Sequence, residues 1–365
     1  MVTQTNLPHR FGGFMNLDDT RRFEELDPGQ MLNEIDQLPD QLETAWELGR
    51  HFPLGEISGV QQVILAGMGG SAIGADLLAA YALPMASVPV IVWRDYDLPA
   101  FAAKPGTLVV VSSHSGNTEE SLSALEAARD CGAQVLAITT GGRLAQAAGA
   151  KGAPVWQFEH PGQPRAAVGF AYGLLLAVFT RLGLIPDPED EFIGTLAVMR
   201  SQQEGIRANV PVVNNPAKRM AGQFMGRWPT ILGADILEPV ARRWRTQIAE
   251  LAKAVAQFEA LPEADHNMVA GVMNPEQLLG STMVVFLRGT TCHPRNQRRA
   301  DATRQVMMLE GFNTDAIEAV GETRMAQQWS ALHFGDYTAY YLAMAYEVDP
   351  TPVEAIEDLK RRLAT

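Results

Sequence analysis

Along residues 60–160, segments with the hydrophobic pattern of β-strands alternate with segments of helical periodicity. This alternation predicts a β-sheet with helices between its strands, an α/β fold. Short apolar runs rich in valine, isoleucine and leucine are separated by segments whose apolar residues recur at helical spacing. The predicted strands are 60–67, 88–93, 107–112, 133–139 and 154–158. Strands that alternate with helices in this way form a parallel sheet, because a helical crossover returns the chain to the same end of the sheet. We therefore expect a parallel sheet with helices on both faces.

The second half of the chain repeats this pattern in kind. Strands are expected at 229–234, 283–287 and 313–320, and helices at 237–261, 299–310 and 329–344. The expected fold class is α/β, with two lobes, each a parallel sheet flanked by helices, and helical extensions at both ends. The expected divisions are an N-terminal helical arm 1–45, a first domain 46–186, a connection 187–216, a second domain 217–347 and a C-terminal helix 348–365.

The charge balance narrows the range of partners. The chain of 365 residues has 29 Lys and Arg against 42 Asp and Glu, a formal net charge of −13. This excess argues against general binding of nucleic acid or an anionic membrane, but a site can still be locally positive. The two cysteines, Cys131 and Cys292, show no pairing pattern, and the N-terminus lacks the pattern of a signal peptide. We expect a cytoplasmic protein.

A glycine-rich turn follows the first predicted strand. Gly67-Met-Gly-Gly-Ser-Ala-Ile-Gly opens a helix and matches G-x-G-x-x-A, and Asp95 lies just after the next strand. This arrangement is compatible with a dinucleotide-binding site. It is equally compatible with glycines that only allow a helix to pack close to a strand.

A second turn, Ser112–Ser121 (SSHSGNTEES), follows the third predicted strand and favours a different ligand. Several short hydroxyl donors and the free amides of a helix start suit a monophosphate, whereas a dinucleotide needs only the one glycine-rich turn. An N-cap role would explain the second turn alone, but two such turns in one sheet favour the phosphate. The predicted phosphate-binding residues are Gly70, Ser71, Ser113, Ser115 and Thr118.

The two turns carry a resemblance to a known family. G-M-G-G-S followed two strands later by S-x-S-G-N-T resembles the sugar isomerase (SIS) fold family. Four further segments narrow the resemblance to one family within this fold. They are QPRAA (163–167), ARRWRTQIAELAK (241–253), LPEADHN (261–267) and the C-terminal DPTPV (349–353). Together, and in this order along nearly the whole chain, they resemble the bifunctional phosphoglucose/phosphomannose isomerases.

The resemblance implies four catalytic positions. Glu250 would move the proton between C1 and C2, Arg165 would face the enediolate, and His266 and Lys360 would assist ring opening. It also implies a homodimer and a place in glycolysis and gluconeogenesis. Whether the histidine acts in its own site or reaches a neighbour's site stays open. The chain departs from the family at the neighbours of the glutamate, where Ala249 and Leu251 replace the usual asparagines, and at Met268, which replaces a commonly acidic residue. These replacements leave the carboxylate in place but alter its polar surroundings.

The chemistry of the residues agrees with these roles. Aldose–ketose isomerisation needs one carboxylate to transfer a proton, a cation opposite the enediolate and a group that passes protons near neutral pH. No clustered Cys, His or Asp spacing suggests a metal, so neither a metal nor a cofactor is expected. Considered alone, Glu250 is a typical solvated glutamate, and Arg242, Arg243 and Arg245 form a salt-bridged helix face. For His114, inside the second turn, a solvent-facing position is favoured over contact with the ligand.

The expected function is interconversion of glucose 6-phosphate, and of mannose 6-phosphate, with fructose 6-phosphate through a cis-enediol. A sugar-phosphate-binding SIS protein without catalysis, or a nicotinamide-dependent oxidoreductase that uses Asp95, would share some of the motifs. A thermal-stability titration with NAD(H) and fructose 6-phosphate separates these alternatives, since only a true ligand raises the melting temperature.

Overall fold

The first sheet has five parallel strands, as the hydrophobic pattern predicts. The computed structural model describes residues 16–363, so residues 1–15 of the predicted arm and residues 364–365 lie outside the described residues. The strand order is β2-β1-β3-β4-β5. The strands are β1 Gln62–Gly67, β2 Val90–Trp93, β3 Thr107–Ser113, β4 Gln134–Thr139 and β5 Val155–Gln157. The chain leaves β1 for β2 on one side and returns to β3 on the other, so a topological switch lies between β1 and β3.

The second sheet is also parallel, with the order β7-β6-β8-β9. Its strands are β6 Trp228–Ala234, β7 Gln257–Leu261, β8 Thr282–Arg288 and β9 Asn313–Glu318. Strand β7 contradicts the predicted helix over 237–261, since helix α10 ends at Leu251. The sequence QFEAL is too short and too polar to distinguish an edge strand from the end of a helix, and pairing with β6 decides the outcome.

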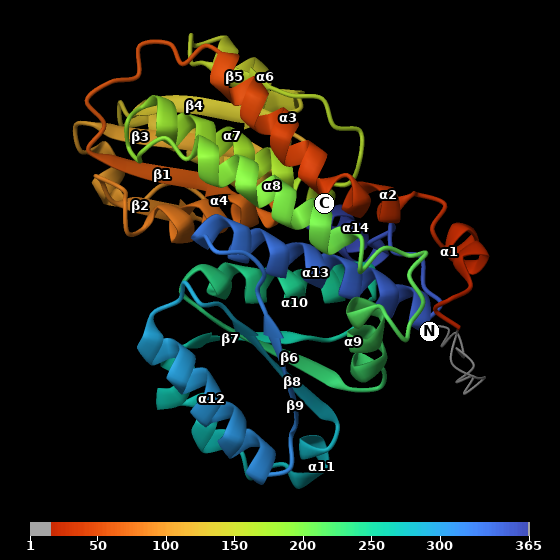
Figure 1. Cartoon of the computed structure of the whole chain (residues 1–365). Helices are drawn as coiled ribbons and strands as arrows, with labels where there is room; N and C mark the ends of the chain where they lie inside the picture. Colours follow the sequence, from red (N-terminus) through yellow and green to blue (C-terminus); the bar gives the residue numbers. More distant parts are fainter. Residues whose placement is uncertain (1–15, 364–365) are drawn as a thin grey trace.

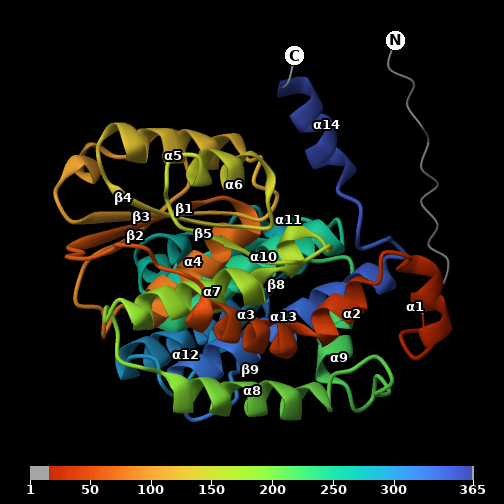
Figure 2. The same ribbon diagram turned by 90° about the horizontal axis from the view of Figure 1, so that it is seen from above.

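The two faces of the first sheet are buried under different helices, which explains its near-continuous apolar strands. Val63, Leu65 and Leu108 point toward α3 (Leu38–His51), α4 (Gly69–Ala82) and α7 (Val168–Arg181). The alternate residues Ile64 and Val109 point toward α5 (Glu119–Asp130) and α6 (Gly142–Gly149). Figure 2 shows α5 and α6 above the sheet and α3, α4 and α7 below it.

Two helices lie between the sheets and join the lobes. Helix α10 (Glu238–Leu251) and helix α13 (Arg324–Ala345) separate the two sheets in Figure 1. Residues of both helices belong to one hydrophobic core that also contains α4 and α7. Side chains of the two lobes therefore meet in a continuous interior, which allows a site to draw residues from both.

The remaining helices cover the outer surfaces. They are α1 Thr20–Leu26, α2 Met31–Asp36, α8 Glu189–Gln203, α9 Pro216–Phe224, α11 Glu276–Leu279, α12 Pro294–Leu309 and α14 Glu354–Leu363. Both expected helical extensions are present within the described residues, and α14 extends away from the body in Figure 2. Within residues 16–363, no helix is both long and apolar enough to cross a membrane.

Candidate functional site

The two predicted turns lie side by side at the switch between β1 and β3. Gly67, the last residue of β1, is paired in register with Ser112 of β3. Helix α4 begins at Gly69 and α5 at Glu119, so two helix starts lie at the same edge of the sheet. Carboxyl strand ends at a switch point and the amides of helix starts are the usual binding place for an anion in such sheets.

Two glycines in these turns are required by close approaches. A Cβ at Gly70 would lie 2.4 Å from the Pro164 carbonyl oxygen and 3.3 Å from the Arg165 Cα. A Cβ at Gly116, where φ is +64°, would lie 1.9 Å from the Gly141 carbonyl oxygen. The first turn therefore packs directly against the segment that carries Arg165.

The hydroxyl groups of the second turn are close to one another. Ser113 Oγ donates a hydrogen bond to Thr118 Oγ1 at 3.1 Å, and Ser115 Oγ accepts one from the Asn117 amide at 3.2 Å. Thr118 is the N-cap residue of α5, but its side chain makes no capping hydrogen bond. Ser71 and Ser113 are buried, whereas Ser115 is exposed. The turn is thus organised by its own hydroxyls rather than as a simple helix cap.

Arg165 and Glu250 come from different lobes and meet beside these turns. Arg165 lies in a short 3₁₀ helix, η2 (Pro164–Ala166), and its Nη1 is 3.8 Å from Glu250 Oε2 in the last turn of α10. Arg165 Nη2 donates to the carbonyls of Pro350 and Thr351 at 2.9 and 2.5 Å. Burial lowers the pKa of Arg165, and the carboxylate of Glu250 opposes that shift.

A buried ion pair supports the arginine segment. Arg243 of α10 makes two hydrogen bonds to Asp336 of α13, at 3.1 and 2.7 Å, and both side chains are almost completely buried. Arg243 Nη1 also donates to the Arg165 carbonyl at 2.8 Å. The expected salt bridge of Arg243 is therefore present, but it lies in the interior, because its partner Asp336 lies far away in sequence and packs against it only in the folded protein.

Replacing Asp336 by asparagine is expected to lower the free energy of unfolding by about 3–5 kcal/mol, because Arg243 would stay buried without its counter-charge. Chemical denaturation measures this change. Asp301→Asn is the control, since its ion pair with Arg288 is exposed and worth less than about 1 kcal/mol. Equal losses in the two variants would contradict the role of the buried pair.

Lys253 belongs to the same group, although no sequence signal singled it out. Its Nζ donates to the Glu250 carbonyl at 2.6 Å and to the Pro350 carbonyl at 3.3 Å. Partial desolvation of the ammonium group lowers the pKa of Lys253 to about 8; Arg165 adds to the shift, and Asp349 and Glu250 oppose it. Its φ of +54° is left-handed, which costs a non-glycine residue roughly 1–2 kcal/mol.

His114 of the second turn does not face solvent as expected. Its Nε2 is 2.9 Å from Nδ1 of His160, whose Nε2 is 2.9 Å from Glu34 Oε2 in α2. Burial, with a smaller contribution from His160, lowers the pKa of His114 to about 4, so its ring is neutral at pH 7. This chain of hydrogen bonds connects α2, the second turn and the loop that leads to Arg165.

Within one copy of the chain, neither His266 nor Lys360 lies next to Arg165, Glu250 and Lys253. Glu250 precedes the start of β7 and His266 follows its end, and the five residues of β7 span about 16 Å. Lys360 is exposed on α14. Within residues 16–363, no hydrogen bond or ion pair joins His266 or Lys360 to Glu250 or Arg165.

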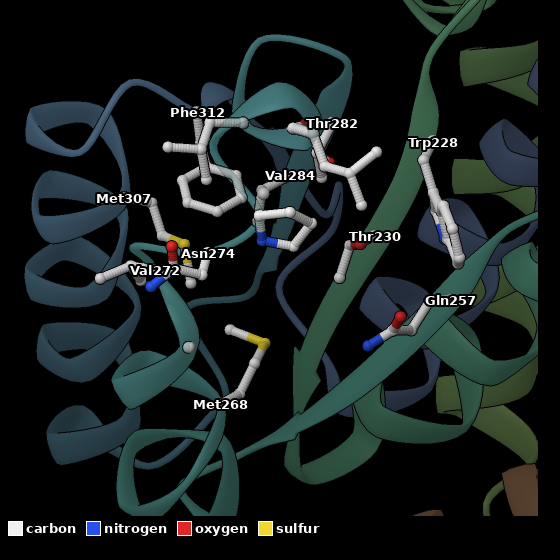
Figure 3. Close-up of a pocket in the computed structure, with 14 residues that line it drawn as sticks. Trp228, Thr230, Gln257, Met268, Val272, Asn274, Thr282, Val284, Met307 and Phe312 are labelled. Carbon is white, nitrogen blue, oxygen red and sulfur yellow. The ribbon is translucent and has the colours of Figure 1, made fainter.

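A separate cavity of about 190 Å³ lies in the second lobe. Figure 3 shows that Trp228, Met268, Met307 and Phe312 line it, together with a few polar side chains. None of the predicted catalytic or phosphate-binding residues lines it, although Met268, which departs from the family pattern, does. Among the described residues, no group of three or more His, Cys, Asp or Glu side chains is arranged to hold a metal ion.

Comparisons with known proteins agree with this geometry. Residues 56–150 match the model of the SIS domain, and residues 213–363 match that of the bacterial phospho-glucose isomerase C-terminal SIS domain. A hypothetical protein of Thermus thermophilus has the same fold, with a TM-score of 0.72 and 18% identity, over 96% of this chain and 94% of its own. Two SIS-type lobes therefore define the class of this protein.

The relatives identify the family within that class. A bifunctional phosphoglucose/phosphomannose isomerase of Caldicellulosiruptor bescii is 38% identical over 92% of this chain and 99% of its own length. One from Aquifex aeolicus is 30% identical over 82% of this chain and 90% of its own. The chain belongs to the bifunctional phosphoglucose/phosphomannose isomerase family.

Proposed function

We propose that the protein interconverts glucose 6-phosphate and mannose 6-phosphate with fructose 6-phosphate. The observation that carries the proposal is the ion pair of Arg165 and Glu250, from different lobes, at 3.8 Å beside the glycine-rich and the hydroxyl-rich turn. A carboxylate and an arginine in this arrangement supply a base and a fixed positive charge at one place.

The chemistry is an intramolecular proton transfer. With the 6-phosphate in the two turns, Glu250 takes the proton from C2 of the open-chain aldose and returns it to C1. The developing negative charge on the enediolate oxygens is stabilised by Arg165, whose guanidinium is held in place by the carbonyls of Pro350 and Thr351. The same steps run in reverse from fructose 6-phosphate.

In this proposal, His266 and Lys360 assist the opening of the sugar ring. Because His266 lies at the other end of β7 from Glu250, it would act in the site of a second copy of the chain. A homodimer is therefore part of the proposal, and α14 would bring Lys360 toward a site by movement of the segment before it.

A coupled assay that reports glucose 6-phosphate and mannose 6-phosphate separately, with fructose 6-phosphate as substrate, tests the function. Formation of both products is expected. Binding of fructose 6-phosphate without turnover would favour a non-catalytic SIS protein. A rise in melting temperature with NAD(H) but not with fructose 6-phosphate would favour the oxidoreductase.

The double replacement of Ser113 and Thr118 by alanine is expected to raise KM about 10²- to 10⁴-fold and to change kcat little. Hydrogen bonds to a charged group contribute about 1.5–3 kcal/mol each, and these would be lost in ground state and transition state alike. Steady-state kinetics with fructose 6-phosphate measures the effect. Ser121→Ala, a buried serine further along α5, is the matched control. An unchanged KM would remove these two residues from the phosphate site.

A further inference from the structure

Lys253 is a lysine at a helix end where glycine is the usual residue. Helix α10 ends at Leu251 with Ala252 as its C-cap, and Lys253 follows with a φ of +54°. The amides of Ala252 and Ala254 both donate to the Ile248 carbonyl, at 3.1 and 3.4 Å. In this type of helix end, the residue after the C-cap has a left-handed backbone, which glycine adopts most easily. A lysine at this position, where glycine would fit better, therefore indicates a role for its side chain.

That side chain reaches the group formed by Arg165 and Glu250. Its Nζ and Arg165 Nη2 donate to the same acceptor, the Pro350 carbonyl, at 3.3 and 2.9 Å. Its second hydrogen bond, at 2.6 Å, is to the carbonyl of Glu250. Two positive groups from different lobes thus converge on the segment that leads to α14, next to the carboxylate.

We propose that Lys253 is a positioning residue of the isomerase site, whose ammonium group holds the 349–351 segment against Arg165 and Glu250. The inference rests on the proposed function. With Lys253 charged, the Pro350 carbonyl stays in place for Arg165, and the guanidinium keeps its orientation toward the substrate. Lys253 also adds positive charge near the enediolate, without contacting the reacting atoms.

The charged surroundings of Lys253 make this role dependent on pH. Arg165 faces it from η2, Glu250 from α10 and Asp349 from the segment before α14. Arg227 and Tyr346 line the open pocket that Lys253 borders. A lysine with a pKa of about 8 is charged at pH 7 and becomes neutral as pH rises through 8, so activity should fall over that range.

A simpler role is also available, since a lysine can cap the last carbonyls of its own helix. The substitution Lys253→Gly distinguishes the capping role from the positioning role. A capping lysine replaced by glycine would leave activity unchanged, whereas a positioning lysine would lose activity although the helix end is relieved of strain. Glu347→Gly is the matched control, because Glu347 follows the C-cap of α13 with the same φ of +54°.

The experiment measures melting temperature, kcat, KM and the pH profile for the wild type, Lys253→Gly, Lys253→Arg and Glu347→Gly. Both glycine variants are expected to melt at or above the wild-type temperature. Only Lys253→Gly should lose kcat, by 10-fold or more at pH 7 with little change in KM, and the fall in activity near pH 8 should disappear. Lys253→Arg should recover much of kcat and remain active at pH 9, since arginine keeps its charge.

Two outcomes would overturn the proposal in distinguishable ways. A Lys253→Gly variant that folds and has wild-type kcat and pH profile would show a capping lysine and leave the proposed function intact. A wild-type protein without isomerase activity on fructose 6-phosphate would contradict the proposed function, and this inference with it.

Discussion

Replacing Glu250 by glutamine is expected to lower kcat for fructose 6-phosphate about 10²- to 10⁴-fold, the usual contribution of a general base. Glutamine has the size of glutamate but cannot accept a proton from carbon. Because the side chain is only partly buried and its 3.8 Å contact with Arg165 is long, the fold and the phosphate turns should tolerate the change. Sugar-phosphate affinity should stay near that of the wild type.

Kinetics and a separate binding titration with fructose 6-phosphate measure the two effects independently. Glu238→Gln, in the first turn of the same helix, is the matched control and should retain wild-type kcat. Wild-type turnover in Glu250→Gln would remove Glu250 as the base. Loss of binding together with turnover would point to a role in substrate recognition.

Replacing Arg165 by lysine is expected to lower kcat about 10²- to 10³-fold, the scale found when a donor to a developing oxyanion is lost. One guanidinium nitrogen of Arg165 contacts two carbonyls while the other lies near Glu250. Lysine keeps the positive charge but lacks this planar group, so it cannot make both sets of contacts. The positive charge would therefore remain in the site without its orientation. KM should change less than kcat, because the phosphate turns are untouched.

Arg181→Lys is the matched control, since Arg181 also donates from one guanidinium nitrogen to two carbonyls, at 2.8 and 2.5 Å, but lies at the outer end of α7. Its melting temperature should fall about as far as that of Arg165→Lys, and its kcat should not change. Equal kcat values for the two variants and the wild type would show that Arg165 only anchors the 350–351 carbonyls.

Together these variants divide the site by function. Ser113 and Thr118 should govern KM, Glu250 and Arg165 should govern kcat, and Lys253 should govern the fall in activity at alkaline pH. Arg243 and Asp336 should appear chiefly in the free energy of unfolding, because they act on the site through the Arg165 carbonyl. Such a division would be difficult to explain for a binding protein without catalysis.

Much of the fold could be predicted because its signals are local. Apolar runs such as Thr107–Ser112 are buried on both faces and could only be interior strands. The error at β7 has the opposite origin, since a short edge strand takes its conformation from the partner it pairs with. The predicted domain boundaries stay predictions, because one hydrophobic core crosses from lobe to lobe.

The sequence by itself determined the first sheet, three of the four strands of the second sheet, and the two turns at the switch between β1 and β3. These features are local, because a strand end, a turn and a helix start are consecutive residues. Only the tertiary structure decided that Arg165 and Lys253 share the Pro350 carbonyl beside Glu250. The same is true of Arg243, which is buried against Asp336, and of His114, which joins His160 and Glu34. These groups come from elements far apart in the chain. Their proximity depends on how α10 and α13 pack between the lobes, which no local pattern of residues encodes.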